Sequence, residues 1–255
     1  MTICISAICT EDEKEHIVFA VDHMITTGIG EFEHNSNKYS LITDNTVGMV
    51  SGRALLMNYL LDDDYSNKTY SEIQNIIEDK FKQKRLEQIQ KEILDVYSID
   101  FDFVKDLLKN QIVNEFQNQI LIGITKTKLN TAVLLIGFEE GNAKISEISE
   151  TGIVNFNQIN FHTIGSGSIQ AQNTLLFQNH SKDNDLKTTL YNVYKAKKNA
   201  EAMQGVGKET DIGFLNEKGI QMLTNEDINI LDQIYNEELI YGKTHEKLNE
   251  LNINV

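Results

Sequence analysis

The sequence contains no proline, no tryptophan and only two cysteines. Without proline, its turns must be formed by glycine, asparagine and aspartate, which tolerate the backbone conformations that turns require. Cys4 and Cys9 lie in one strand-like segment at odd spacing, so their side chains are expected on opposite faces of a strand. A disulfide between them is therefore not expected, and both are predicted to be buried apolar residues of a protein from a reducing compartment.

Long apolar runs and basic patches are also missing. No apolar segment is long enough to cross a bilayer, and residues 1–10 lack the length and basic start of a signal peptide. Lys and Arg number 23 against 38 Asp and Glu, which gives a formal net charge of −15. Nucleic-acid binders normally carry a basic face, and anionic membranes repel an acidic protein. We therefore expect a cytoplasmic protein with neither nucleic-acid nor membrane partners.

The residues that commonly bind metals or phosphates form no recognisable motif. The six histidines show no metal-site spacing with cysteine or carboxylate residues. Gly205 and Gly207 lack the strand and helix context of a phosphate-binding loop. The acidic run Asp62–Asp64 could bind a hard cation, but exposed acidic runs are usually solvated. The sequence thus predicts neither a metal nor a cofactor.

Short apolar segments and segments of helical periodicity alternate along the chain. Strands are predicted for residues 3–9, 17–22, 38–42, 46–50, 131–138, 143–148, 160–164 and 211–215, with a hairpin around residues 139–142. Helices are predicted for residues 53–61, 69 to about 116, 168–178, 185–203 and 225–251. Leu55 and Leu56 belong to an apolar packing stripe of the first helix, and a capping-box pattern at Thr69 and Glu72 starts the second. This order is typical of sheets with helices on their outer faces, the α/β (α+β) class. We expect one domain over residues 1–255, with an inserted helical stretch at about 66–116 and a helical acidic extension at about 216–255.

A set of short motifs in fixed order carries a family resemblance. The motifs are Thr2 behind the initiating methionine, Phe19-Ala20-Val21-Asp22 at a strand end, Thr27-Gly28, Lys38 before an apolar strand, Val50-Ser51-Gly52-Arg53-Ala54, and Ile164-Gly165-Ser166-Gly167. No single motif is specific, but the ordered set across residues 2–215 resembles the proteasome β-subunit family. The resemblance implies a four-layer αββα sandwich of the N-terminal nucleophile hydrolase type.

The resemblance also implies a threonine peptidase that cleaves peptide bonds through an acyl-enzyme on Thr2. Removal of the initiating methionine would expose an α-amine, whose pKa near neutrality suits it to accept the hydroxyl proton. By resemblance, Lys38 would polarise that hydroxyl and Asp22 would hold Lys38 through an ion pair. The backbone N–H of Gly52 would bind the oxyanion, and Ser166 would orient the amine.

Substrate and partners are likewise implied by the resemblance. The substrate would be a peptide or unfolded protein, and the chain would assemble into a ring or related homo-oligomer that other proteasome-type subunits could join. The pocket for the residue before the cleaved bond would be lined by small or apolar side chains, namely Ile25, Ser36, Val50 and Ala54. We therefore predict a preference for an apolar side chain at that position.

Departures from the family pattern leave alternatives open. The family's second aspartate and the serine three residues after it are replaced here by Met203 and Val206. This change favours a non-catalytic structural subunit of the same fold as an alternative. A transpeptidase that uses the same acyl-enzyme is a third hypothesis. Cys4 could also serve as a nucleophile, but its place in an apolar strand favours a core role.

Overall fold

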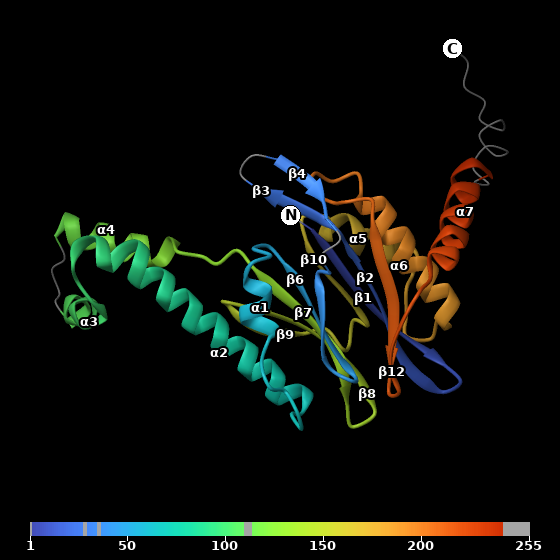
Figure 1. The fold of residues 1–255 in the computed structure, drawn as a ribbon, viewed down its shortest axis with the longest axis horizontal. Coiled ribbons are helices and arrows are strands. Elements are labelled where there is room, and N and C mark those ends of the chain that lie inside the picture. The colour runs from blue at the N-terminus through green and yellow to red at the C-terminus, as the bar shows by residue number, and fades with distance from the viewer. Residues whose placement is uncertain (1, 28–29, 35–36, 110–113, 242–255) are drawn as a thin grey trace, which may run out of the picture.

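The computed structural model describes residues 2–27, 30–34, 37–109 and 114–241. Helices account for 42% of the protein and strands for 31%, so neither class dominates and the protein is of mixed α+β type. Two five-stranded antiparallel sheets form the body, and helices pack against them (Figure 1). None of the helices in these ranges combines the length and apolar character that crossing a bilayer requires.

The first sheet begins with the N-terminal strand and carries both cysteines. Its order is β10, β1, β2, β11 and β12, which span Phe161–Gly165, Ile3–Glu11, Lys14–Asp22, Thr210–Asn216 and Gly219–Met222. Strand β1 is buried on both faces, which explains its nearly continuous apolar sequence. Cys4 faces the second sheet and Cys9 faces the helices, and both are free and buried, as the spacing predicted.

The second sheet contains the hairpin predicted around residues 139–142. Its order is β5, β6, β7, β8 and β9, which span Tyr39–Thr43, Thr46–Ser51, Ala132–Glu139, Asn142–Ser149 and Gly152–Asn155. A separate two-stranded hairpin, β3 (Met24–Thr27) and β4 (Gly30–Glu33), follows β2. Strands β3, β4, β9 and β12 were not predicted, because each has four residues and short segments give little periodicity.

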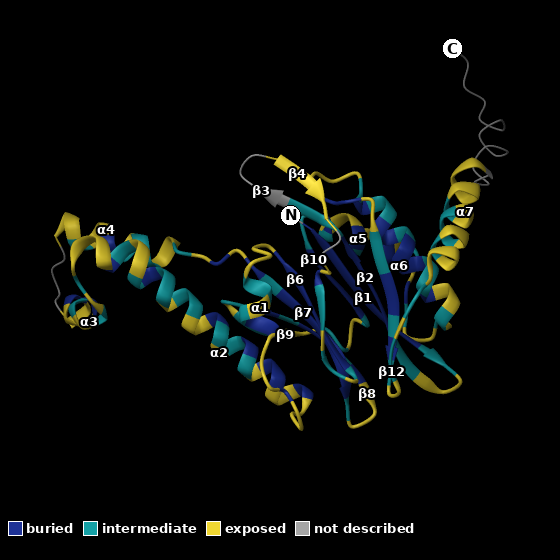
Figure 2. Cartoon of the chain, viewed as in Figure 1, coloured by how far each residue is buried: buried dark blue, intermediate teal, exposed yellow. Residues whose placement is uncertain are grey.

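Three hydrophobic cores lie between the layers, and buried residues occupy the centre of the body (Figure 2). One core joins the first sheet to α5 (Ser168–Phe177) and α6 (Leu186–Ala200), with α7 (Asn225–Tyr241) packed at its edge. The next lies between the two sheets. The last joins the second sheet to α1 (Leu56–Leu61) and α2 (Tyr70–Ile89).

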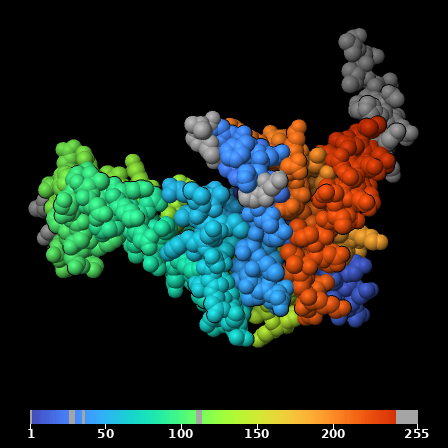
Figure 3. Space-filling model, viewed as in Figure 1, coloured from blue at the N-terminus to red at the C-terminus, as the bar shows by residue number. Residues whose placement is uncertain are grey.

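Helix α2 extends beyond the body into a helical arm. The predicted capping box at its start is confirmed, since Thr69 and Glu72 each bind the other's backbone N–H. The arm continues through α3 (Phe101–Lys109) and α4 (Glu115–Lys126), beyond the expected end near residue 116. It projects clearly in Figure 3 and has a small core of its own, formed by Ile89, Leu94, Val104 and Ile120.

Helix boundaries differ from the expectation at two other places. Helix α1 begins at Leu56 rather than Arg53, and Leu55 before it provides no side-chain cap. Leu55 is 95% exposed, so it is not part of the core that the apolar pattern indicated. In the predicted C-terminal helix, α7 covers residues 225–241, and the remainder of that prediction lies outside the described residues.

Candidate active site

The antiparallel pairing of β1 and β2 brings the N-terminal end of β1 to the C-terminal end of β2. The register pairs Cys4 with Val21, so Thr2 and Asp22 lie at the same end of the two strands. The backbone N–H of Ile3 donates to Oδ1 of Asp22 over 3.1 Å, which fixes the carboxylate beside Thr2. Two residues that are twenty positions apart thus become neighbours because of the sheet register.

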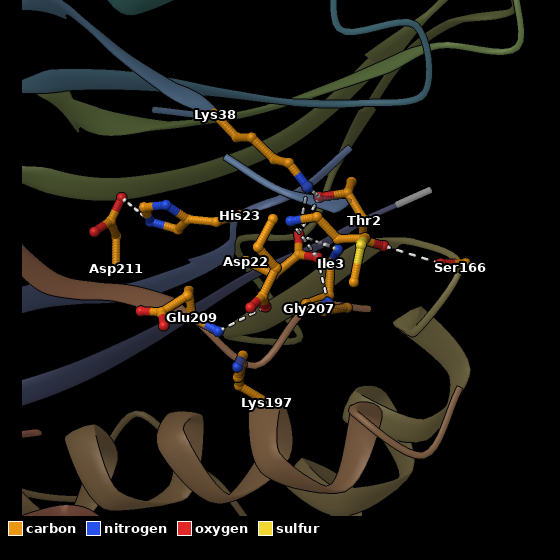
Figure 4. A network of polar contacts seen from close by, with 12 residues as sticks. Thr2, Ile3, Asp22, His23, Lys38, Ser166, Lys197, Gly207, Glu209 and Asp211 are labelled. Carbon is orange, nitrogen blue, oxygen red and sulfur yellow. Dashed lines mark hydrogen bonds and ion pairs between the residues drawn. The ribbon is translucent and has the colours of Figure 1, made fainter. Parts of the chain in front are cut away.

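Thr2, Asp22 and Lys38 point toward one another and form one hydrogen-bonded group (Figure 4). Lys38 Nζ lies 2.5 Å from Thr2 Oγ1 and 2.7 Å from Asp22 Oδ1. The Thr2 hydroxyl accepts from the ammonium and donates to the Asp22 carboxylate. Thr2 is 2% exposed, Asp22 0% and Lys38 8%. Water therefore screens their interactions poorly, and each charge acts strongly on its neighbours.

The second carboxylate oxygen of Asp22 binds two backbone N–H groups. Oδ2 accepts from Gly207 at 2.8 Å and from Met24 at 3.3 Å. Together with Ile3 and Lys38, these donors compensate the desolvation of a fully buried carboxylate. No sequence motif links Gly207 to this site, and its N–H contacts Asp22 because the chain folds back beside β2.

Gly52 lies just after β6, in a turn that only glycine fits. Its φ is +105°, and a Cβ there would lie 2.1 Å from the carbonyl oxygen of Asn130. An L-residue would meet both a backbone clash and an unfavourable backbone conformation. Gly52 borders the same cleft as Thr2 and Lys38. The structure therefore places the predicted oxyanion residue beside the predicted nucleophile, and its role in binding an oxyanion stays a prediction.

Ser166 contacts Thr2 through the backbone. Its hydroxyl donates to the carbonyl oxygen of Thr2 over 3.3 Å. Gly165 allows this approach, because a Cβ at its position would lie 2.1 Å from the same oxygen and its φ is +109°. Ser166 thus holds the backbone of Thr2, and orientation of the α-amine by Ser166 stays a prediction.

A cleft of about 790 Å³ opens beside Thr2 and Lys38. Three of the four predicted pocket residues line it: Ile25, Val50 and Ala54. The fourth, Ser36, lies outside the described residues, as do Gly28 of the Thr27-Gly28 motif and Met1. Further apolar residues of the lining are Met24, Leu55, Leu56 and Met57, and the polar residues Asn37, Arg53 and Asn58 complete it. Sequence periodicity assigned Leu55 and Leu56 only to a packing stripe, because it does not distinguish a core face from a cleft wall.

The sequence also offered Cys4 as an alternative nucleophile and several possible metal-binding side chains. Cys4 is fully buried, and burial together with the nearby Asp22 charge raises the pKa of its thiol, so it is held as a neutral thiol. Within the described ranges, no group of three or more His, Cys, Asp or Glu side chains is arranged to hold a metal ion. The groups that meet at this site are the Thr2 hydroxyl, the Lys38 ammonium and the Asp22 carboxylate.

No protein-family model matches the chain, and no curated protein matches it either. A hydroxyl in contact with a buried ammonium, itself oriented by a buried carboxylate, is an arrangement suited to an activated nucleophile. The apolar cleft beside it provides space for a substrate side chain.

Proposed function

We propose that this chain is an N-terminal threonine hydrolase of the proteasome β-subunit type, which cleaves peptide bonds through an acyl-enzyme on Thr2. The observation that carries the proposal is the 2.5 Å contact between Lys38 Nζ and Thr2 Oγ1, within a buried ion pair of Lys38 and Asp22. A solvated lysine, the ordinary alternative for Lys38, would not be buried against a threonine hydroxyl.

The architecture supports the same assignment. The four-layer αββα sandwich of N-terminal nucleophile hydrolases has two facing sheets between helices. Here one core joins the two sheets, and separate cores join each sheet to its outer helices. In this arrangement, β1 places Thr2 at the edge of the inter-sheet layer, where Lys38 reaches it from the segment before β5.

The proposed reaction begins after removal of the initiating methionine, which leaves Thr2 with a free α-amine. That amine takes the hydroxyl proton while Oγ1 bonds to the substrate carbonyl carbon. Lys38 stabilises the charge that develops on Oγ1, and the Gly52 N–H binds the oxyanion of the tetrahedral intermediate. The intermediate then expels the amine product, which receives the proton, and leaves an ester on Thr2. Water activated by the same α-amine hydrolyses this ester and restores the enzyme.

Substrate preference follows from the lining of the cleft. Ile25, Val50 and Ala54 present apolar groups beside Thr2, and α1 adds Leu56 and Met57 together with the polar Asn58. We therefore propose peptides or unfolded segments with an apolar residue before the cleaved bond. Assembly into a ring or related homo-oligomer is part of the proposal, and sedimentation velocity would show a mass several times that of the monomer.

The test combines intact mass with covalent labelling. A peptide α′,β′-epoxyketone with an apolar side chain forms a ring adduct only where a hydroxyl and a free α-amine belong to one residue. We expect loss of one methionine, one adduct per chain, and its location on Thr2. Thr2→Ala should abolish the adduct, whereas Thr151→Ala, which alters an exposed turn residue, should retain it. A processed Thr2 that forms no adduct would exclude the hydrolase mechanism.

A non-catalytic subunit of the same fold is the second candidate, and one observation favours it. At the positions where the family has an aspartate and a serine, Met203 is 43% exposed and Val206 is buried beside Gly167. Neither side chain can donate or accept a strong hydrogen bond near Thr2. A retained initiating methionine in protein from the native host would support this candidate. If an adduct forms, products formed in the presence of an acceptor peptide would distinguish hydrolysis from transpeptidation by mass.

A further inference from the structure

Lys197 is a fully buried lysine on α6, at 0% exposure. Its ammonium donates to Oε1 of Glu201 over 2.8 Å and to the carbonyl oxygen of Lys208 over 2.6 Å. Burial lowers the pKa of Lys197, and the nearby carboxylates of Glu201 and Asp22 oppose that effect. A methionine or leucine would fill this space without the cost of desolvating a charge, so core packing alone does not account for a lysine.

Residues 207–209 connect Lys197 to the candidate active site. The N–H of Gly207 donates to Asp22 Oδ2 over 2.8 Å, and Lys197 binds the carbonyl of the next residue, Lys208. On the other side, Glu33 from β4 accepts the N–H groups of Lys208 and Glu209. A short backbone segment is thus held by side chains from α6, β2 and β4. Figure 4 shows Asp22, Gly207 and Lys197 in this region.

Gly207 leaves little room for any other arrangement of this segment. A Cβ at its position would lie 2.6 Å from Glu33 Oε1 and 3.0 Å from the backbone nitrogen of Met24. The segment is therefore packed directly against the β3–β4 hairpin, and its N–H reaches Asp22 only in this close approach. The carbonyl bond from Lys197 fixes the same segment from the helix side.

We propose that Lys197 is a positioning residue of the Thr2 site. By holding the Lys208 carbonyl, it keeps the Gly207 N–H on Oδ2 of Asp22, which leaves Oδ1 directed at Lys38 and Thr2. Its positive charge also acts on the Asp22 carboxylate from the side opposite Lys38. This inference rests on the proposed function, because the group that it orients is the proposed partner of the nucleophile.

The test compares Lys197→Met with Lys198→Met. Lys198 is the matched control, because its ammonium also lies near Glu201, at 3.4 Å, but is not bonded to residues 207–209. The first measurement is hydrogen exchange of the Gly207 amide by NMR, which requires no catalysis. We expect exchange of Gly207 to accelerate about tenfold in Lys197→Met, with amides of the central strands unchanged. In Lys198→Met it should stay within about twofold of the parent protein.

The second measurement is peptide turnover. Lys197→Met should lower kcat about tenfold or more with KM nearly unchanged, because the cleft is intact and only the orientation of Asp22 is lost. A general loss of packing would instead alter KM and accelerate exchange throughout the core. Equal Gly207 exchange and equal kcat in Lys197→Met and Lys198→Met would overturn the proposal.

If Lys197→Met does not fold, the milder substitution Glu201→Gln tests the role of Lys197. Glu201→Gln keeps the shape of the partner and removes its charge, so it should weaken the hold of Lys197 and produce the same two effects at smaller size. Unchanged Gly207 exchange and unchanged kcat in a folded Glu201→Gln protein would then overturn the proposal. If the parent protein hydrolyses no peptide while Lys197→Met still releases the Gly207 amide, the proposed function fails and the tether to Asp22 stands.

Discussion

The ammonium nitrogen of Lys38 lies 2.5 Å from the hydroxyl oxygen of Thr2, and both groups bind the same oxygen of Asp22. The three groups form a closed set, because each hydrogen-bonds to the other two. Removing one member therefore leaves a buried polar or charged group without its partner, which affects stability as well as chemistry. A substitution in this group is therefore expected to change both the catalytic rate and the free energy of unfolding.

Lys38→Met should reduce both activity and stability. The substitution keeps most of the side-chain volume but leaves the fully buried Asp22 carboxylate without its cation. Breaking a buried ion pair in this way costs about 3–5 kcal/mol of unfolding free energy. Loss of the group that polarises the Thr2 hydroxyl should lower the rate of peptide hydrolysis about 100-fold or more. Urea denaturation and the rate of epoxyketone labelling measure the two effects.

The control for Lys38 is Lys82→Met. Lys82 pairs with Glu78 on the exposed face of α2, where solvent screens the interaction and a measurable loss of stability is not expected. Labelling of Thr2 should also continue at the parental rate. Equal unfolding free energies of the Lys38 and Lys82 variants would show that the buried ion pair contributes no more to stability than the exposed one. That result would contradict the proposed site.

Gly52→Ala should impair the reaction more than the fold. An alanine at φ +105°, with its Cβ 2.1 Å from the Asn130 carbonyl, forces the turn to move. The expected cost in stability is about 1–3 kcal/mol. Displacement of the Gly52 N–H should lower kcat about 100-fold if it binds the oxyanion.

A glycine in open surroundings provides the comparison for Gly52. An added Cβ at Gly30 would have no atom within 4 Å, so Gly30→Ala should leave kcat unchanged. Both variants are measured with the same fluorogenic peptide and by thermal denaturation. A kcat in Gly52→Ala equal to that in Gly30→Ala would contradict the assigned role of Gly52.

The strands and helices that could be predicted are those with strong local signals. Strand β1 and the part of β2 from Ile17 onward are apolar segments, and the Thr69–Glu72 capping box marks the start of α2. Four-residue strands such as β9 and β12 lack such signals, since their pairing partners rather than their own sequence determine them. The arm extends to Lys126 because a second capping box, formed by Asn114 and Gln117, starts α4, and this pattern can be recognised in the sequence.

In the candidate site, too, sequence patterns predict some residues, whereas others depend on contacts between distant segments. Thr2, Asp22 and Lys38 were predicted together only through their order in a family pattern, and the register of β1 and β2 explains why two of them meet. Lys197 and Gly207 could not be predicted in this way. Their link to Asp22 depends on contacts between α6, a loop and β2, and no periodicity or motif in a single segment encodes such contacts.

Neither cysteine should react in the native protein. Burial raises the pKa of the Cys9 thiol to about 11, and burial also raises the pKa of Cys4 strongly. At pH 8 both remain protonated and inaccessible, so Ellman's reagent should detect no thiol before denaturation and two after it. Iodoacetamide should also leave peptide hydrolysis unchanged. Inactivation by stoichiometric alkylation of Cys4 would instead favour the cysteine as nucleophile.

Stability should fall on the acid side because of His180. Its Nε2 bonds to the Ile8 carbonyl over 3.0 Å, its Nδ1 is buried without a partner among the described residues, and burial lowers the pKa of the imidazole from 6.5. Below pH 6.5 the unfolded chain takes up a proton here while the native protein does not, so the unfolding free energy decreases as the pH falls.

The His180 contribution is measured by urea denaturation at several pH values between 5 and 8. His180→Gln cannot titrate, so it should lose less stability between pH 8 and pH 5 than the parent protein does. His34→Gln, at an exposed position, should show the parental dependence. Parallel curves for the parent protein and His180→Gln would mean that other groups cause the acid sensitivity.

Ala54→Glu should change which peptides the cleft accepts without disturbing the core. Ala54 lines the cleft beside Thr2 but is exposed, so a longer side chain there has solvent space and displaces no buried group. The lining is mostly apolar but includes Arg53, which precedes Ala54 in the chain, and a carboxylate added at position 54 disfavours an apolar substrate side chain and attracts a basic one. One methylene more or less in a hydrophobic pocket already discriminates between substrates by about 10- to 200-fold, so an added charge should have a readily measured effect. We expect kcat/KM to fall for a peptide with leucine before the cleaved bond and to rise for the matched peptide with lysine.

The control is Ala54→Gln, which has a side chain of similar size without a charge and so distinguishes the effect of size from that of charge. It should lower kcat/KM for the leucine peptide without raising kcat/KM for the lysine peptide. An unchanged ratio of the two peptides in Ala54→Glu would mean that the substrate side chain binds elsewhere, because a charge this close to Thr2 must act on any residue held in the cleft.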